Sequence, residues 1–156
     1  MMKGLFGGTA EPEGTFEVTR PDEEWRLILT PQQYAVLRQH GTERAGTSPL
    51  DAEKRGGVFV CAGCGNPIFV SDTKFESGTG WPSFYAPLEG AVETSEDRKF
   101  FMVRTEVHCS RCGGHLGHVF TDGPEPTGLR YCMNGVAMNF KPGQASDDSS
   151  TPRGRS

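Results

Sequence analysis

Short apolar runs separated by turn residues begin near Gly57 and predict β-strands over residues 58–60, 68–70 and 100–107. Asn66-Pro67 lies between the first two runs and predicts a turn. Glycine and proline, 21 and 11 of the 156 residues, are spread along most of the chain without a repeat. The chain is therefore expected to be rich in short strands and turns, with little helix.

Two short helices are expected ahead of these strands. Residues 30–33, Thr-Pro-Gln-Gln, combine a hydroxyl N-cap, proline at the first helical position and a glutamine that can bond back to the cap. This helix should stop by Gly41. Residues 21–25, Pro-Asp-Glu-Glu-Trp, place acidic side chains where a first helical turn favours them, with Trp25 as a candidate core anchor.

The composition fits one domain with two tails. At 35% hydrophobic and 23% charged residues, the chain can bury one modest core, which we assign to residues 15–142. Residues 1–14 are rich in glycine, proline and glutamate, and residues 143–156 are polar without an apolar anchor. We expect a mobile N-terminal tail and a disordered C-terminal tail, with a further loop over 46–57.

Charge and hydropathy exclude two classes of partner. The net charge is −4, and no basic run is longer than Lys54-Arg55, so we expect neither nucleic acid nor an anionic membrane as a partner. We expect no secretory signal, because residues 1–8 lack a long enough apolar core, and no stretch reaches the roughly 18 consecutive apolar residues that a spanning helix requires. An odd number of cysteines, with two pairs at metal spacing, fits a reducing compartment and predicts a cytoplasmic location.

Four of the five cysteines form two pairs, Cys61-x-x-Cys64 and Cys109-x-x-Cys112. Each pair follows a predicted strand in a glycine-containing turn, the geometry of a zinc knuckle. Four soft thiolates complete a tetrahedral shell and leave no open position, so they favour a structural site for one Zn²⁺ that joins two distant segments. The competing hypotheses are a redox switch that loses metal on oxidation, and His108 as an alternative ligand.

The fifth cysteine, Cys132, is a candidate nucleophile. In a strand, the period of two places Arg130, Cys132 and Asn134 on one face, with Tyr131 and Met133 on the other. A neighbouring positive charge or imidazole lowers the pKa of a thiol and favours the reactive thiolate. The alternative is that Cys132 fills the core, since free cysteine is among the most buried residue types.

Other candidate residues have ordinary interpretations too. His115 and His118 lie three residues apart in a glycine-rich segment and could be turn residues or a second metal site, although no further cysteine or nearby carboxylate completes one. Trp81 could be a core residue. We interpret His40, near the end of the second predicted helix, as structural or solvated.

Together these residues carry a family resemblance. From about residue 25 to residue 142 the chain resembles the B-type peptide-methionine (R)-S-oxide reductases. Besides the two cysteine pairs, the matching segments are residues 77–84 (SGTGWPSF), 117–120 (GHVF), 122–124 (DGP), 126–128 (PTG) and 130–134 (RYCMN). The resemblance implies a mainly β fold of two packed antiparallel sheets with short N-terminal helices, and zinc on the four paired cysteines.

The resemblance also implies a reaction, the reduction of methionine-R-sulfoxide in proteins or peptides. Methionine sulfoxide has a partly positive sulfur, a polar oxygen and a methyl group, so its reduction needs a nucleophile, donors to the oxygen and an apolar cage. Cys132 is then the residue that attacks the sulfur and becomes a sulfenic acid. The expected oxygen donors are His115, His118 and Asn134, and the expected substrate-binding residues are Trp81, Phe120 and Arg130.

The sequence departs from many members of this family at two positions. Thr79 stands where relatives carry a resolving cysteine, and Gly135 stands where many have serine. With four thiols on zinc, Cys132 has no evident partner for an internal disulfide. We therefore expect an external thiol, such as thioredoxin, glutaredoxin or a small thiol, to reduce the sulfenic acid. A noncatalytic zinc-binding module and a redox-controlled chaperone are the rival classes.

Overall fold

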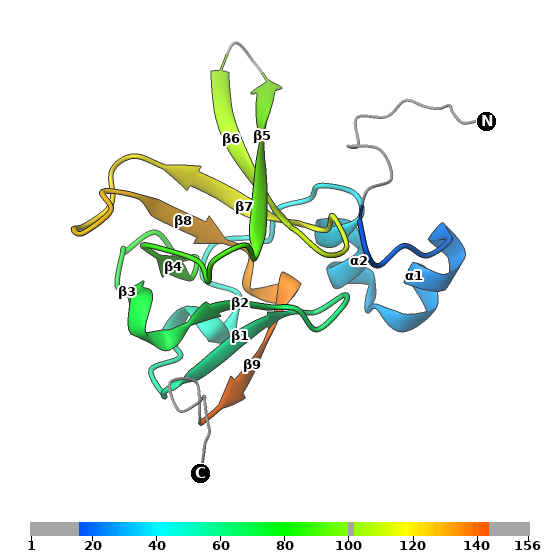
Figure 1. Cartoon of the computed structure of the whole chain (residues 1–156), viewed down its shortest axis with the longest axis horizontal. Coiled ribbons are helices and arrows are strands. Elements are labelled where there is room, and N and C mark those ends of the chain that lie inside the picture. Colours follow the sequence, from blue (N-terminus) through cyan, green and yellow to red (C-terminus); the bar gives the residue numbers. More distant parts are fainter. Residues whose placement is uncertain (1–15, 100–101, 144–156) are drawn as a thin grey trace.

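A computed structural model describes residues 16–99 and 102–143, which form a mainly β fold of two antiparallel sheets and two short helices (Figure 1). The expected fold class is confirmed. The two expected tails lie outside the described residues, apart from Gly143. No helix in the described part of the chain is long and apolar enough to cross a membrane.

Both expected helices are present. Helix α1 spans Asp22–Ile28 and has three acidic residues in its first turn. Helix α2 spans Pro31–Leu37 and begins with the expected capping box. The Thr30 hydroxyl accepts a hydrogen bond from the Gln33 backbone N–H at 3.1 Å, and the Gln33 side chain accepts one from the Thr30 N–H at 2.9 Å. The helix ends at Leu37, and His40, three residues later, has a left-handed backbone conformation with a φ of 58°.

The smaller sheet has three strands in the order β2-β1-β9. Its central strand β1 (Gly57–Cys61) pairs with β2 (Pro67–Val70) on one side and β9 (Met138–Pro142) on the other. The expected strands at 58–60 and 68–70 are therefore confirmed. The expected loop over 46–57 contains one short 3₁₀ helix, η2 (Pro49–Ala52). Two further 3₁₀ helices are η3 (Ser71–Thr73) and η4 (Gly135–Ala137).

The larger sheet has six strands in the order β3-β4-β8-β7-β6-β5. Their bounds are β3 Lys74–Phe75, β4 Ser83–Phe84, β8 Arg130–Met133, β7 His115–Phe120, β6 Met102–Cys109 and β5 Val92–Lys99. Strand β6 overlaps the strand expected at 100–107 and extends two residues past it. Residues 100 and 101 are not described. In Figure 1 the β5–β6 hairpin projects away from the rest of the molecule.

Aromatic side chains pack the two sheets together. Phe84 of β4 stacks on Phe69 of β2 with ring centroids 4.1 Å apart, and it meets Phe59 of β1 edge-on at 5.0 Å. All three rings are fully buried. Offset stacked and edge-on aromatic pairs stabilise a core beyond the area that they bury. Since Ser83, next to Phe84, pairs with Cys132, this contact also fixes the strand that bears the candidate nucleophile.

The helices cover the turns that carry the paired cysteines. Trp25 of α1 is 2% exposed and confirms the expected core anchor. A Cβ atom added to Gly63, in the first cysteine turn, would lie 3.3 Å from the Trp25 ring. A Cβ atom added to Gly114, after the second turn, would lie 2.8 Å from Leu37. The two turns therefore need small residues where the helices press on them.

Candidate active site and metal centre

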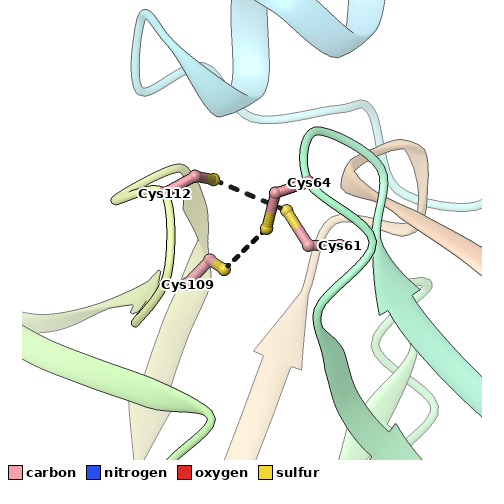
Figure 2. Close-up of side chains that lie close together, drawn as sticks. All are labelled: Cys61, Cys64, Cys109 and Cys112. Carbon is pink, nitrogen blue, oxygen red and sulfur yellow. Dashed lines mark hydrogen bonds between the residues drawn. The ribbon is translucent and has the colours of Figure 1, made fainter. Parts of the chain in front are cut away.

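The four paired cysteines meet between the two sheets (Figure 2). Cys61 ends β1 of the smaller sheet, and Cys109 ends β6 of the larger one. Their sulfurs and those of Cys64 and Cys112 all lie within 4.8 Å of one another. The Cys61–Cys112 and Cys64–Cys109 Sγ distances are 3.8 and 3.6 Å. Ligands about 2.3 Å from a tetrahedral zinc ion would be about 3.8 Å apart, so the four sulfurs fit one metal ion.

Hydrogen-bond donors reach the sulfurs of Cys61, Cys109 and Cys112. The Gly63 backbone N–H donates to Cys61 Sγ at 3.3 Å, and the Asn66 amide donates to Cys109 Sγ at 3.6 Å. The Arg38 guanidinium lies 3.9 Å from Cys112 Sγ and donates to the Cys112 carbonyl at 3.1 Å, while stacking over the Trp25 ring at 4.4 Å. Such donors stabilise negative thiolates around a metal. His108 is on the opposite face of β6 from Cys109, because neighbouring strand residues alternate.

Cys132 opens into a pocket of about 270 Å³ at the larger sheet. Its strand β8 lies between β4 and β7 and pairs Cys132 with Ser83 and His118. The expected strand face is confirmed, because Arg130 and Asn134 line the same pocket while Met133 is buried in the core. The remaining lining residues are Thr42, Thr79, Trp81, Arg104, Gly117, His118 and Phe120.

Two opposing effects set the acidity of Cys132. Burial raises the pKa of the thiol, and this effect outweighs the neighbouring Arg130 charge and a hydrogen bond from Thr79, both of which lower it. The sequence anticipated the influence of Arg130 but not the larger cost of desolvation. The net pKa is raised, so the thiol keeps its proton at neutral pH.

Arg130 is held at the rim of the pocket by two contacts. Its guanidinium donates to both carboxylate oxygens of Asp122, at 2.9 and 3.1 Å, and lies over the Phe120 ring at 4.5 Å. The two-point contact with Asp122 fixes the plane of the guanidinium. Phe120 therefore presents its ring beside a fixed positive charge.

The segment before β4 is organised by hydroxyl groups. Thr79 Oγ1 accepts the Trp81 backbone N–H at 3.3 Å and lies 2.9 Å from Ser77 Oγ. Ser77 Oγ is in turn 2.7 Å from the buried Ser83 Oγ. This chain of hydroxyls fixes the backbone on both sides of Trp81, whose ring forms one wall of the pocket.

Glu43 connects several of the pocket residues, and the sequence did not single it out. Its backbone N–H donates to Asn134 Oδ1 at 2.8 Å, and its backbone carbonyl accepts the Trp81 indole N–H at 3.0 Å. Its carboxylate accepts the backbone N–H groups of Gly135 and Val136 at 2.8 and 3.0 Å. One residue therefore holds the amide, the indole and the turn that follows β8.

The contacts of Asn134 define how its side chain points. The amide is 3% exposed, and its nitrogen donates to the Leu116 carbonyl at 3.0 Å. Within residues 16–99 and 102–143 this is the one acceptor recorded for that nitrogen, so its second hydrogen remains for a pocket ligand.

His118 lines the pocket from β7. Its Nε2 lies 3.0 Å from Asp97 Oδ2, and the same carboxylate oxygen accepts a hydrogen bond from Arg104 at 2.9 Å. Burial lowers the pKa of His118 more than the Asp97 contact raises it. The imidazole is therefore neutral at pH 7 and oriented by a carboxylate.

His115 lies next to His118 but is not among the residues that line the pocket. It is fully buried, its Nδ1 is 3.3 Å from the Val36 carbonyl, and its ring centroid is 5.5 Å from that of His118. Burial lowers the pKa of His115 to about 4, against the opposing effect of Glu106. At neutral pH both histidines of the matched segment are thus uncharged hydrogen-bonding groups.

The structure adds charged and aromatic neighbours that the sequence did not connect with the site. Glu106 lies near both His115 and His118, whereas from the sequence we expected no nearby carboxylate to complete a second metal site with them. His40, interpreted as structural or solvated, is half-exposed and lies 3.0 Å from the same Glu106 carboxylate. The strand register accounts for the position of Glu106 beside the histidines, because Glu106 of β6 pairs directly with His118 of β7.

Comparison with known proteins identifies close relatives. The SelR domain model matches residues 29–142. The peptide methionine sulfoxide reductase MsrB of Methanosarcina barkeri is 59% identical over 125 residues, which are 80% of this chain and 88% of the relative. The MsrB proteins of Leptospira interrogans and Agrobacterium fabrum are 55% and 54% identical over 127 residues, covering 81% of this chain and 97% and 94% of theirs.

The contacts of Glu43 predict a stability effect. In Glu43→Gln, one of the two backbone N–H groups loses its acceptor and faces an amide donor, so the free energy of unfolding should fall by about 1–3 kcal/mol. Urea unfolding measures this change. Glu89→Gln, at an exposed turn position, is the matched control and should unfold like the wild type. Equal stability of the two variants would contradict the role assigned to the Glu43 carboxylate.

Proposed function

Because the chain belongs to the SelR domain family and is a peptide-methionine (R)-S-oxide reductase, we propose that Cys132 reduces the sulfoxide through a sulfenic acid. One observation carries this proposal. Cys132 shares a single pocket with an indole, a phenyl ring, an imidazole and an amide. These are the groups that a methionine sulfoxide side chain requires: a nucleophile, an apolar wall and hydrogen-bond donors.

In the proposed first step, the Cys132 sulfur attacks the sulfoxide sulfur and the S–O bond of the substrate breaks. The oxygen passes to Cys132 and the thiol proton ends on it, giving Cys–SOH and methionine. The sulfoxide is reduced by two electrons and the thiol is oxidised by two, so the step is balanced. Because burial raises the pKa of Cys132, the proton that the oxygen needs is carried by the thiol itself.

The proposed donor to the sulfoxide oxygen is the free amide hydrogen of Asn134. His118 joins it when the imidazole takes up a second proton, because the one N–H of the neutral ring is directed at Asp97. Both line the pocket, and each is oriented by a second contact, Asp97 for the imidazole and Glu43 for the amide. Donors held in place before the reaction stabilise the charge that develops on oxygen. His115 supports this network from behind His118.

Trp81 and Phe120 are the proposed walls for the substrate methyl group, with Arg130 fixed beside Phe120. The sulfoxide sulfur is chiral and carries an oxygen, a methyl group and the rest of the side chain. A site with the methyl pocket on one side and the oxygen donors on the other accepts one arrangement of these three groups. The site should therefore distinguish the two epimers. The R epimer is the one that the family reduces.

Regeneration of Cys132 is proposed to depend on an external thiol. The other four cysteines converge on one another, and Thr79, which stands where the family resemblance leads us to expect a resolving cysteine, lines the pocket together with Cys132. An external thiol would condense with the sulfenic acid, releasing water and leaving a mixed disulfide. A second thiol would then free Cys132 as a thiol. Thioredoxin, glutaredoxin and small thiols have the required chemistry, and a cytoplasmic location, where such thiols are kept reduced, stays a prediction.

The metal proposed for the four-cysteine cluster is Zn²⁺. The sulfur separations fit a tetrahedral ion, and Cys61, Cys64, Cys109 and Cys112 would hold it. When bound, zinc would neutralise the thiolates and join the two sheets, with no open position for catalysis. This role does not require oxidation of the cysteines, as a redox-controlled chaperone would.

Replacement of the proposed nucleophile tests the assignment directly. Cys132→Ser should lower the rate of methionine-R-sulfoxide reduction at least about 10³-fold, since a hydroxyl cannot form the sulfenic acid. Zinc content, measured by elemental analysis, should stay near one per chain. Cys61→Ser is the contrasting variant, which should lose zinc and folding stability together. Retained turnover in Cys132→Ser would rule out the assignment.

The recycling scheme predicts the state of the protein after one turnover. When the reduced protein meets excess substrate without any thiol, intact-mass analysis should show the addition of one oxygen, and trapping with dimedone should locate it on Cys132. Thr79→Cys provides the comparison, because it restores a thiol beside Cys132 and should shift the product toward an internal disulfide. A wild-type product that has lost two hydrogens instead would contradict the external-thiol scheme.

A further inference from the structure

All four histidines of the chain gather around one carboxylate, that of Glu106. His40 Nδ1 lies 3.0 Å from Glu106 Oε2, and His108 Nε2 lies 3.1 Å from Oε1. His115 Nε2 lies 3.6 Å from Oε2, beyond hydrogen-bond distance. The ring of His118 adjoins that of His115, with centroids 5.5 Å apart. This cluster is separate from the four-cysteine cluster and is formed by imidazole and carboxylate groups alone.

Three members of the cluster have the geometry of a metal site. Glu106, His115 and His118 each offer a ligand atom, these atoms lie within 4.8 Å of one another, and all three residues are buried. Two ligands about 2.0–2.2 Å from a tetrahedral ion would be about 3.4 Å apart, close to the 3.6 Å between His115 Nε2 and Glu106 Oε2.

His115 provides a second, independent observation. Its side chain is fully buried, and within the described residues Nε2 has no hydrogen-bond partner. The Val36 carbonyl, 3.3 Å from Nδ1, takes the ring N–H and leaves the Nε2 lone pair directed at the Glu106 carboxylate. Two facing lone pairs repel each other unless a cation lies between them, and an unpaired buried polar atom is costly.

The surroundings resemble those of metal-binding histidines in general. A carboxylate commonly orients a ligating imidazole from behind, and Asp97 contacts His118 at 3.0 Å in this way. The Val36 carbonyl does the same for His115. The side chain of His40 is 50% exposed, so the cluster reaches solvent and an ion has a path to it.

We propose that Glu106, His115 and His118 form a second metal site, which takes a divalent transition-metal ion such as Zn²⁺ or Co²⁺. Two imidazoles and one carboxylate suit these borderline ions better than Mg²⁺ or Ca²⁺, which prefer oxygen ligands. His118 also lines the Cys132 pocket, so an ion held there withdraws His118 from the substrate. This consequence for turnover rests on the proposed function, whereas binding of the ion does not.

Metal titration of the zinc-loaded full chain tests the site. Calorimetry with Zn²⁺ should detect one equivalent beyond the metal already present, and Co²⁺ added to the same protein should give visible bands without the intense thiolate absorption of a sulfur site. Glu106→Gln should weaken this second equivalent at least about tenfold while retaining the first. Glu96→Gln, an exposed substitution on the neighbouring strand β5, should bind like the wild type.

The outcomes separate the second site from the reductase assignment. Absence of a second equivalent at saturating metal, or unchanged binding in both Glu106→Gln and His115→Gln, overturns the site. Retention of the first metal in these variants shows that they are folded. If the site is present, added Zn²⁺ should inhibit turnover in the wild type and do so less in Glu106→Gln. A chain that binds the second ion yet reduces no sulfoxide would refute the proposed function and leave the site intact.

Discussion

The convergence of four cysteine sulfurs is the contact on which the rest of the structure depends. The first pair follows a strand of the smaller sheet and the second follows a strand of the larger one, so a single ion would join the two sheets. Helices α1 and α2 pack on both turns through Trp25 and Leu37. A small domain with short strands has a limited core, and a metal that links distant segments replaces part of the stability that a larger core would supply. The second consequence is chemical, because a metal on this cluster would take up four of the five thiols.

The pocket is assembled on this scaffold by long-range polar contacts rather than by neighbouring residues in sequence. Strand β8 brings Cys132 between β4 and β7, and Glu43, from the loop after α2, bonds to both Asn134 and Trp81. The backbone of Glu43 thus holds the amide and the indole at a set separation, while its carboxylate holds the turn after β8. Such preorganisation lets donors act on a developing charge without first having to reorient.

Much of this arrangement could be predicted from the sequence, and the failures have physical causes. The capping box of α2, the strand at the first cysteine pair and the shared face of Arg130 and Cys132 follow from local spacing. Strand β5 was not anticipated because VETSEDRK is polar, and it lies at the edge of the sheet, where it pairs with β6. Glu43 and Glu106 could not be recognised either, since their partners lie up to 93 residues away and only the folded chain brings them together. The raised pKa of Cys132 depends on burial, which local sequence does not report.

We propose that one pocket, built around the Cys132 thiol, reduces one epimer of methionine sulfoxide with an external reductant. The most direct test is an assay with separated R and S epimers of a methionine sulfoxide peptide, with thioredoxin and a small dithiol as alternative reductants. We expect consumption of the R epimer only, with turnover that continues as long as either external thiol is supplied. Comparable consumption of the S epimer, or no consumption of the R epimer with either reductant, would contradict the proposal.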